Sequence, residues 1–371
     1  MNVEAKVSEC YAKGAKERQE ALCCPVDYDT NLLKMLPQEI IERDYGCGDP
    51  SRYVQEGDTV LDLGSGGGKI CYMAAQLVGD KGQVIGVDMT DEMLALARRH
   101  QNEMAEKLGG DRVSFRKGYI QDLALNVEAM ENYLAANPMS PDADSSRLNE
   151  WKEQQRHERP LVESDSVDLV VSNCVLNLVA ESDRTQMISE IFRVLRPGGR
   201  VAISDIVSDE IVPQHLQEDD ELWSGCISGA FQELQFAQSF LDAGFVLVSY
   251  DKWDDQPWQV VEGIEFRSVT LMALKPSPES CLDIGQAVIY KGPYSEVRDD
   301  ENNIYRRGVR IAVCESTYKS ITEGPLKDDF IGIDPESPKP AVKFCAAPGT
   351  TRPASETKGG EHSSSSSSSC C

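Results

Sequence analysis

The chain has 371 residues, of which 40% are hydrophobic and 27% charged, so it can bury a core over most of its length. Its formal net charge of −25 repels phosphate backbones and anionic lipid, which argues against nucleic acid and membrane surfaces as partners. The N-terminal residues are polar, and no apolar run approaches the roughly 18 residues of a membrane helix. We therefore expect a globular, cytoplasmic protein whose twelve cysteines are reduced thiols.

The length predicts two globular parts and a tail, because one hydrophobic core seldom organises this many residues. Residues 1–50 are predicted to form an N-terminal helical cap. Residues 51–275 alternate between strand-like and helical runs, which is typical of an α/β, Rossmann-like sheet with helices on both faces; a charged stretch at about 121–160 is interpreted as an insertion. Residues 276–334 predict a small, mainly β unit, and the Pro- and Ser-rich residues 335–371 predict a disordered tail.

Within the α/β part, the sequence gives a specific order of elements. The predicted strands lie at 59–63, 83–87, 113–117, 167–172, 200–206, 245–250 and 264–273. The predicted helices lie at 70–78, 91–108, 184–195 and 232–243.

A glycine-rich turn follows the first predicted strand, in the run TVLDLGSGGGK at 59–69. Glycines there allow a ligand to approach the backbone closely, next to the N-terminus of a helix. The second strand ends at Asp88, roughly 20 residues further on, where a carboxylate can accept hydrogen bonds from ribose hydroxyls. The spacing is not that of a dinucleotide site and no basic group is placed for a diphosphate, which favours a cationic, phosphate-free nucleoside over NAD. The alternatives are a turn that only packs a helix on a strand, and an Asp88 that only caps a helix.

Four segments resemble the ordered motifs of class I S-adenosylmethionine-dependent methyltransferases: Val60–Gly66, Gly86–Met89, Gly118–Leu123 and Val194–Gly199. Four more resemble the arsenite methyltransferases within that class: Tyr45–Gly48, Cys71-Tyr72, Val171–Leu178 and Leu222–Cys226. The similarity covers about residues 23–273, and its last two cysteine motifs are the most specific.

The resemblance implies S-adenosylmethionine as the cofactor and assigns roles to matching positions. Asp62, Gly64, Ser65 and Gly66 would hold the methionine end, Asp88 the ribose, Met89 one adenine face, and Ile120 with Gln121 the adenine edge; Asn173 is added to this cofactor-binding set. The family loop usually continues with an Arg-Asp pair, whereas this chain has Gly67 to Ile70, which puts the contacts of that pair in doubt.

Two cysteines stand where an acceptor would bind. Cys174 follows a buried strand, and ligands of open α/β sheets bind outside the carboxyl ends of strands. Cys226 lies in a Gly-flanked segment with little bulk to block a ligand, and two thiolates would select a soft, thiophilic ion. Zinc is not expected, because there is no C-x-x-C pair and the four histidines have no ligand spacing. Burial as ordinary core thiols is the alternative.

The resemblance implies that Cys174 and Cys226 bind trivalent arsenic. It makes Cys47 and Cys71 redox or third-ligand partners, with Cys71 the candidate third ligand. The pairs Cys23-Cys24 and Cys370-Cys371 would hold or deliver the metalloid, or are surface thiols without a function.

The function implied is transfer of methyl groups from S-adenosylmethionine to thiolate-bound arsenite, giving methylated arsenicals for detoxification. Cys47 and Cys71 would reduce the oxidised arsenic by forming a disulfide that thioredoxin or glutathione reopens. The alternatives are a methyltransferase for selenium or tellurium species or a small organic thiol, and a non-catalytic metalloid-binding protein.

Overall fold

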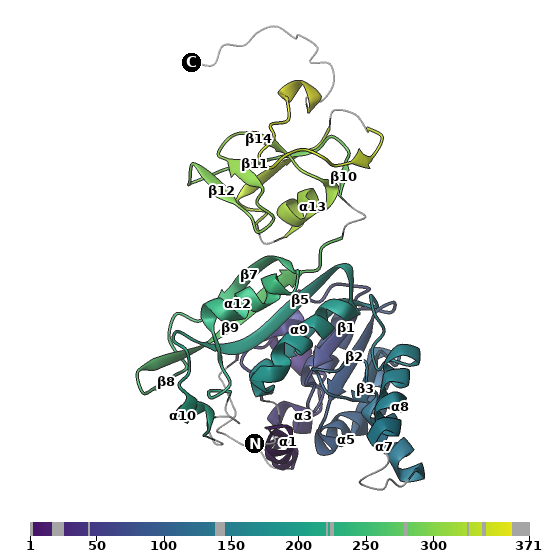
Figure 1. Cartoon of the computed structure of the whole chain (residues 1–371). Coiled ribbons are helices and arrows are strands. Elements are labelled where there is room, and N and C mark those ends of the chain that lie inside the picture. Colours follow the sequence, from purple (N-terminus) through teal and green to yellow (C-terminus); the bar gives the residue numbers. More distant parts are fainter. Residues whose placement is uncertain are drawn as a thin grey trace. The chain divides into compact units, whose positions relative to one another are not determined.

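The computed structural model describes residues 3–16, 26–43, 45–137, 145–219, 222, 226–277, 281–324, 326–335 and 339–357 (Figure 1). The chain divides into two compact units, Met1–Pro276 and Ser277–Cys371. No helix among these described residues is long and apolar enough to cross a membrane.

The first unit is built on a nine-stranded sheet with the order β3-β2-β1-β4-β5-β9-β7, in which β6 also pairs with β5 and β8 with β9. The strands are β1 (Thr59–Leu63), β2 (Gln83–Asp88), β3 (Val113–Lys117), β4 (Val167–Asn173), β5 (Leu195–Ser208), β6 (Phe231–Gln232), β7 (Val246–Trp253), β8 (Gln259–Val261) and β9 (Ile264–Leu274). Strands β1 to β5 are parallel, whereas β7 and β8 pair antiparallel with β9, which itself runs antiparallel to β5. The predicted Rossmann-like sheet is confirmed, with a mixed edge.

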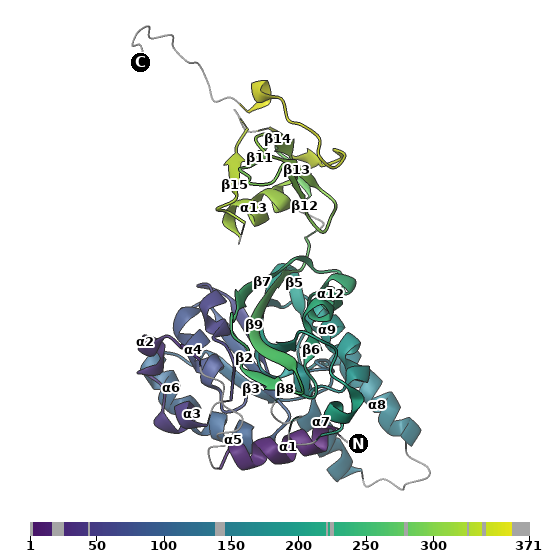
Figure 2. The same ribbon diagram turned by 90° about the vertical axis from the view of Figure 1, so that its left-hand side faces the viewer.

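Helices cover both faces of this sheet, as predicted. The principal ones are α4 (Lys69–Leu77), α5 (Asp91–Arg99), α6 (Gln101–Leu108), α9 (Glu181–Val194) and α12 (Glu233–Asp242). One buried cluster joins the sheet to α9 and α12, and another joins it to α4, α5 and α6. Figure 2 shows α4 and α6 on one side of the sheet and α9 and α12 on the other.

The chain order reverses next to β1, and this places the functional edge. Strand β1 pairs with β2 on one side and with β4 on the other, all parallel. The last residues of these strands, Leu63, Asp88 and Asn173, therefore meet at one edge of the sheet. Such a reversal point is where open α/β sheets bind ligands.

The N-terminal residues precede β1, and part of them lies against this edge while the rest packs beside α4 and the sheet. They form α1 (Val3–Gly14), α2 (Thr30–Leu33), α3 (Gln38–Glu42) and the short 3₁₀ helix η2 (Pro50–Tyr53). Helix α1 contacts α5 and the 3₁₀ helix η3 (Leu176–Leu178) that follows β4. The pair Cys23-Cys24 lies outside the described residues.

The stretch predicted as an insertion contains two helices, α7 (Val127–Ala136) and α8 (Ser145–Glu158). The rings of Tyr133 and Trp151 stack with their centroids 4.6 Å apart, which joins the two helices. The short α10 (Gln214–Gln217) follows β5.

The second unit combines small antiparallel sheets with one helix. Its elements are β10 (Leu282–Asp283), β11 (Ala287–Tyr290), β12 (Glu296–Arg298), β13 (Ile304–Arg306), β14 (Arg310–Ala312), α13 (Glu315–Glu323), β15 (Phe330–Ile333), β16 (Val342–Lys343) and the 3₁₀ helix η5 (Ala354–Glu356). The sheet order is β14-β11-β15, with separate pairs β10-β16 and β12-β13.

Part of the predicted disordered tail belongs to this unit. Strand β16 pairs with β10, and Arg352 forms an ion pair with Asp283 at 2.8 Å. The expectation of disorder from residue 335 is therefore corrected for 339–357: composition suggested a tail, but partners far earlier in the chain order these residues. The remainder of the predicted tail, from residue 358, lies outside the described residues.

Candidate active site

A cleft opens at the functional edge of the first unit, with about 910 Å³ of empty space including the solvent at its mouth. All nine residues predicted to bind the cofactor line it: Asp62, Gly64, Ser65, Gly66, Asp88, Met89, Ile120, Gln121 and Asn173. Cys174 lines the same cleft. The structure thus brings the predicted cofactor residues together with one predicted thiol.

Two glycines of the loop, both with positive φ, lie in different surroundings. Gly64 has a φ of +68°, and a Cβ there would lie 2.4 Å from a methyl carbon of Val175. Gly66 has a φ of +50°, and a Cβ there would meet nothing within 4 Å, so its backbone faces open space. Between them, the hydroxyl of Ser65 is buried without a hydrogen-bond partner in the described part of the chain. A buried hydroxyl without a partner beside open backbone suits a polar ligand.

Asp88 ties the end of β2 to this loop. Its two carboxylate oxygens accept hydrogen bonds from the backbone N–H of Gly66 at 2.9 Å and of Thr90 at 2.8 Å. Burial raises the pKa of Asp88, while these N–H groups oppose the rise. Each carboxylate oxygen has a second lone pair, so Asp88 can hold the loop and still accept a ligand hydroxyl.

Cys71 lies at the cofactor end of the site. Its thiol donates to the Asp62 carboxylate at 3.2 Å, and it packs in the cluster beneath α4. Burial first, and then the charge of Asp62, raise the pKa of Cys71. Because Cys47, Cys174 and Cys226 pack in a different cluster, the structure does not bring Cys71 to the predicted metalloid ligands.

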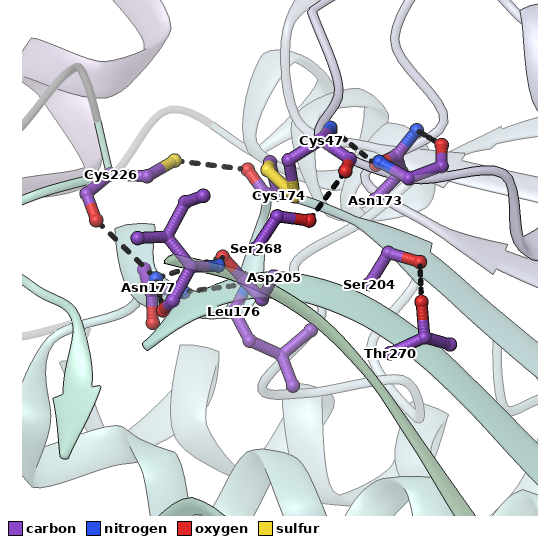
Figure 3. The surroundings of a disulfide bond; sticks show 12 residues. Cys47, Asn173, Cys174, Leu176, Asn177, Ser204, Asp205, Cys226, Ser268 and Thr270 are labelled. Atoms are coloured by element: carbon purple, nitrogen blue, oxygen red, sulfur yellow. Dashed lines mark hydrogen bonds between the residues drawn. A yellow bond between two sulfur atoms is a disulfide. The ribbon is translucent and has the colours of Figure 1, made fainter. Parts of the chain in front are cut away.

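The other three predicted cysteines converge (Figure 3). Cys47 and Cys174 form a disulfide with their Cα atoms 5.9 Å apart, and the Cys226 thiol donates to the Cys174 carbonyl at 3.3 Å. The expectation that all the cysteines are reduced thiols is thus corrected for Cys47 and Cys174. The cause is the turn after Tyr45, which the fold places directly beside the end of β4.

Asn173 holds that turn in place. Its Oδ1 accepts from the backbone N–H of Cys47 at 2.8 Å and of Gly48 at 3.0 Å, and its Nδ2 donates to the Gly48 carbonyl at 2.8 Å. The Ser268 hydroxyl donates to the Cys47 carbonyl at 2.6 Å. Asn173 therefore lines the cleft and also fixes Cys47 against Cys174.

A buried carboxylate that the sequence analysis did not single out completes the cluster. One Asp205 oxygen and the Cys47 and Cys174 sulfurs all lie within 4.8 Å of one another. Asp205 accepts from the Leu176 N–H at 2.9 Å and from Asn177 Nδ2 at 2.8 Å. Burial raises the pKa of Asp205 to about 7, although the N–H groups favour its ionised form. The available signal was an acidic residue inside the apolar run of β5.

The N-terminal cap contributes further lining residues to which the sequence analysis gave no role: Val7, Tyr11, Arg43 and Tyr45. The rings of Tyr11 and Tyr45 meet edge to face with centroids 6.0 Å apart. Tyr11 packs against the buried cluster that contains Cys47, Cys174 and Cys226, and burial first, and then Cys226, raise its pKa. No local motif marked Val7, Tyr11 or Arg43, and Tyr45 stood only within the Tyr45–Gly48 motif, because their place at the cleft arises only when the N-terminal segment packs on the first unit.

Taken together, the geometry offers two adjoining half-sites. One is a cleft with acidic groups and open glycine backbone, suited to a cationic nucleoside. The other is the sulfur cluster of Cys47, Cys174 and Cys226, which shares Cys174 with the cleft and offers the kind of ligand that a soft ion prefers.

Comparisons with known proteins agree with this arrangement. A methyltransferase domain family matches residues 54–134 and 149–252, and a domain family of unknown function matches residues 277–362. The chain is similar to the arsenite methyltransferase of Aquipseudomonas alcaligenes, at 33% identity over 319 residues, covering 81% of this chain and 80% of that one. It is 30% identical to the mouse arsenite methyltransferase over 328 residues, covering 85% and 77% of the two chains.

Among solved structures, the fold is similar to that of an arsenic(III) S-adenosylmethionine methyltransferase from Chlamydomonas reinhardtii, with a TM-score of 0.54 and 28% identity. That match covers 87% of this chain and all of the other. Identity at this level over most of both chains, together with the shared fold, leads to one conclusion: the chain belongs to the arsenite methyltransferase family.

Proposed function

We propose that this protein transfers methyl groups from S-adenosylmethionine to trivalent arsenic held by thiolates. One observation carries the proposal: Cys174 belongs both to the lining of the cofactor cleft and to the sulfur cluster. An acceptor bound at that residue would be adjacent to the cofactor, and alignment of this kind is the main contribution a protein can make to such a transfer.

The cleft residues suit the cofactor by charge and by shape. S-adenosylmethionine, when bound, supplies an electrophilic methyl group on a positively charged sulfur. Asp62 with Gly64 to Gly66 would hold its methionine end, and Asp88 its ribose hydroxyls. The Ser65 hydroxyl gives this ligand a donor that the described part of the protein leaves unused. Met89 would cover one adenine face, while Ile120 and Gln121 would meet the adenine edge and Asn173 would close the cleft beside Cys174.

Cys174 and Cys226 would bind the substrate. Arsenite condenses with two thiols to form two As–S bonds, and two of its oxygens leave as water with the thiol protons. The disulfide with Cys47 must open first, by exchange with an external dithiol such as thioredoxin or with two glutathione molecules. Arsenic keeps its lone pair in this bound form, so the transfer needs no general base.

The structure also supports a change in the reductant pair. Arsenic is formally oxidised by two electrons when it accepts a methyl group, and two thiols that form a disulfide return those electrons. Cys47 and Cys174 are the pair that the fold joins, whereas Cys71 contacts Asp62. We therefore assign the step to Cys47 with Cys174 in place of Cys47 with Cys71.

The test is a methyl-transfer assay with arsenite, methylarsenite, selenite and a small thiol, on the wild type and the Cys174→Ser and Cys226→Ser variants. We expect turnover with the arsenicals in the wild type. Either variant should lose at least tenfold in turnover, because serine replaces a soft donor with a largely protonated hydroxyl. S-adenosylmethionine affinity should stay within a few-fold of the wild type.

Cys345→Ser is the matched control, because Cys345 is an exposed thiol in the second unit. Wild-type arsenite turnover in both the Cys174 and the Cys226 variants would refute thiolate binding at this site. Turnover with the small thiol alone would identify an organic acceptor instead.

A further inference from the structure

The second unit contains two thiols that the proposed reaction does not use. Cys281 lies immediately before β10, and Cys314 is the N-terminal capping residue of α13. Although they are far apart in sequence, β10 contacts α13, which brings the two thiols into the same neighbourhood, and each affects the pKa of the other. Both are free thiols.

Polar groups surround the more buried of the two sulfurs. The Cys314 sulfur lies 3.1 Å from the Ser316 hydroxyl and 3.1 Å from the Thr317 hydroxyl. A cysteine that only fills apolar space needs no such partners. Hydroxyl groups that can donate hydrogen bonds to a sulfur stabilise its thiolate form.

The two thiols also differ in character. Burial disfavours ionisation of Cys314, but the hydroxyls of Ser316 and Thr317 outweigh it and hold the pKa of this thiol below its ordinary value. Burial first, and then the neighbouring Cys314, raise the pKa of Cys281 to about 11. The pair thus combines one sulfur that ionises more easily than an ordinary thiol with one that ionises less easily.

Secondary structure fixes the backbone at both cysteines, and a small solute can reach the pair. The Cys281 carbonyl accepts from the Phe344 N–H at 3.0 Å, which continues the β10-β16 pairing and fixes this segment. Cys314 is fixed by the start of α13. Cys281 is only partly buried, so a small solute can reach the pair from that side.

We propose that Cys281 and Cys314 form a second dithiol site, which binds trivalent organoarsenicals independently of Cys174 and Cys226. A compound RAs(OH)2 condenses with the two thiols, so that two As–S bonds replace two As–O bonds. Two water molecules leave with the thiol protons, and the arsenic stays trivalent. A monosubstituted arsenical has two exchangeable As–O bonds, so two thiols replace both of them. The methylated product of the proposed reaction belongs to this class. Binding involves neither the cofactor nor a redox step.

The test treats the reduced, full-length protein with methylarsenite and maps the products by trypsin digestion and mass spectrometry. Trypsin cuts after Lys291 and Arg310, so Cys281 and Cys314 fall on different peptides. We expect these two peptides to be joined by one methylarsenic group. Cys281→Ser and Cys314→Ser should each abolish the joined product and lower the bound arsenic by about one equivalent. Cys345→Ser, which removes an exposed thiol of the same unit, should leave both unchanged.

Two further comparisons distinguish failure of the second dithiol site from misfolding of a variant and from failure of the proposed methyl transfer. Serine is a favoured helix-capping residue, so Cys314→Ser should keep the wild-type melting temperature. Cys226→Ser should lose arsenite methylation yet keep the bridge between Cys281 and Cys314. The proposal is overturned if the wild type shows no such bridge, if the bridge joins Cys281 to Cys345, or if only a disulfide forms between Cys281 and Cys314.

Discussion

Two of the site cysteines occupy a backbone conformation that side chains other than glycine rarely adopt. The φ angle is 58° at Cys174 and 61° at Cys226. Such positions cost of order 1–3 kcal/mol each and persist only where surrounding contacts enforce them. Here, Asn177 Nδ2 donates to the Ile206 carbonyl at 2.7 Å and to the Cys226 carbonyl at 3.4 Å, which holds the Cys226 segment against β5. The strain is consistent with a sulfur cluster arranged for binding.

Asp88 gives a direct test of the cofactor cleft. Asp88→Ala removes the acceptor of the Gly66 N–H and of the expected ribose hydroxyls, so S-adenosylmethionine affinity should fall by about 1.5–3 kcal/mol, roughly ten- to a hundredfold. Isothermal titration measures this change. Asp91→Asn is the control, because the Asp91 side chain is 72% exposed and pairs with Lys117. Equal affinities for Asp88→Ala and wild type would remove Asp88 from the site.

Cys71 separates a structural role from a redox role. Cys71→Ser should keep arsenite turnover within a few-fold of wild type, since a hydroxyl can still donate to Asp62. Cys71→Ala removes that donor, and we expect S-adenosylmethionine affinity to fall by about 1 kcal/mol, roughly fivefold. Titration and turnover on the two variants check this. A Cys71→Ser enzyme that binds cofactor normally but stalls on arsenite would restore the redox role.

At the scale of elements, Asp205 joins β5 to η3, and Asn177 of η3 also contacts the Cys226 segment, so the ionisation of Asp205 should affect stability. Its pKa is raised to about 7 in the folded state, against about 3.9 in an unfolded chain. The folded state therefore binds this proton more tightly, so the contribution of Asp205 to the free energy of unfolding is full below pH 4 and is lost as pH rises to about 7.

Denaturant unfolding between pH 4 and 8 measures this contribution. In the wild type the Asp205 term should fall across that range, by at most about 4 kcal/mol at 1.36 kcal/mol per pKa unit. Asp205→Asn cannot titrate, so its stability profile should be flatter than that of the wild type. Parallel profiles for the two proteins would mean that Asp205 is ionised throughout.

Strand β16 and the segment after it should contribute to the second unit. Truncation after Pro335 removes the β10-β16 pairing and the Arg352–Asp283 ion pair, in which Arg352 is 10% exposed. We expect the melting temperature of this unit to fall by about 4–8 °C for each kcal/mol lost. Truncation after Thr357 removes a Ser-rich end that the composition predicts to be disordered, and it should change the melting temperature by less than about 1 °C. Calorimetry measures the melting temperatures of both truncated chains. Equal values would show that β16 is dispensable for the stability of this unit.

At the scale of the whole molecule, the cleft draws every lining residue from the first unit. A chain ending at Pro276 should therefore bind S-adenosylmethionine within about twofold of the full-length protein. The same titration, with circular dichroism to verify folding, checks this. A well-folded fragment with a large loss of affinity would show that the second unit supports the cofactor site.

The sequence alone determined those features that depend on local patterns. Alternating strand and helix signals identified the sheet, and the run of glycines directly after the first predicted strand marked the loop at Gly64 to Gly68. Asp88 was recognisable because it ends the second predicted strand, and the end of a strand can be read from the local sequence pattern. The separate second unit was also visible, as a change in composition and spacing near Pro276.

Only the tertiary structure decided which side chains meet. Cys47 and Cys174 are separated by 127 residues, and no local pattern specifies that the turn at Cys47 lies against the end of β4. The same holds for Cys71 beside Asp62, for Asp205 within the sulfur cluster and for β16 beside β10. These contacts depend on which strands become neighbours and where their loops converge, and that is fixed only when the whole core packs.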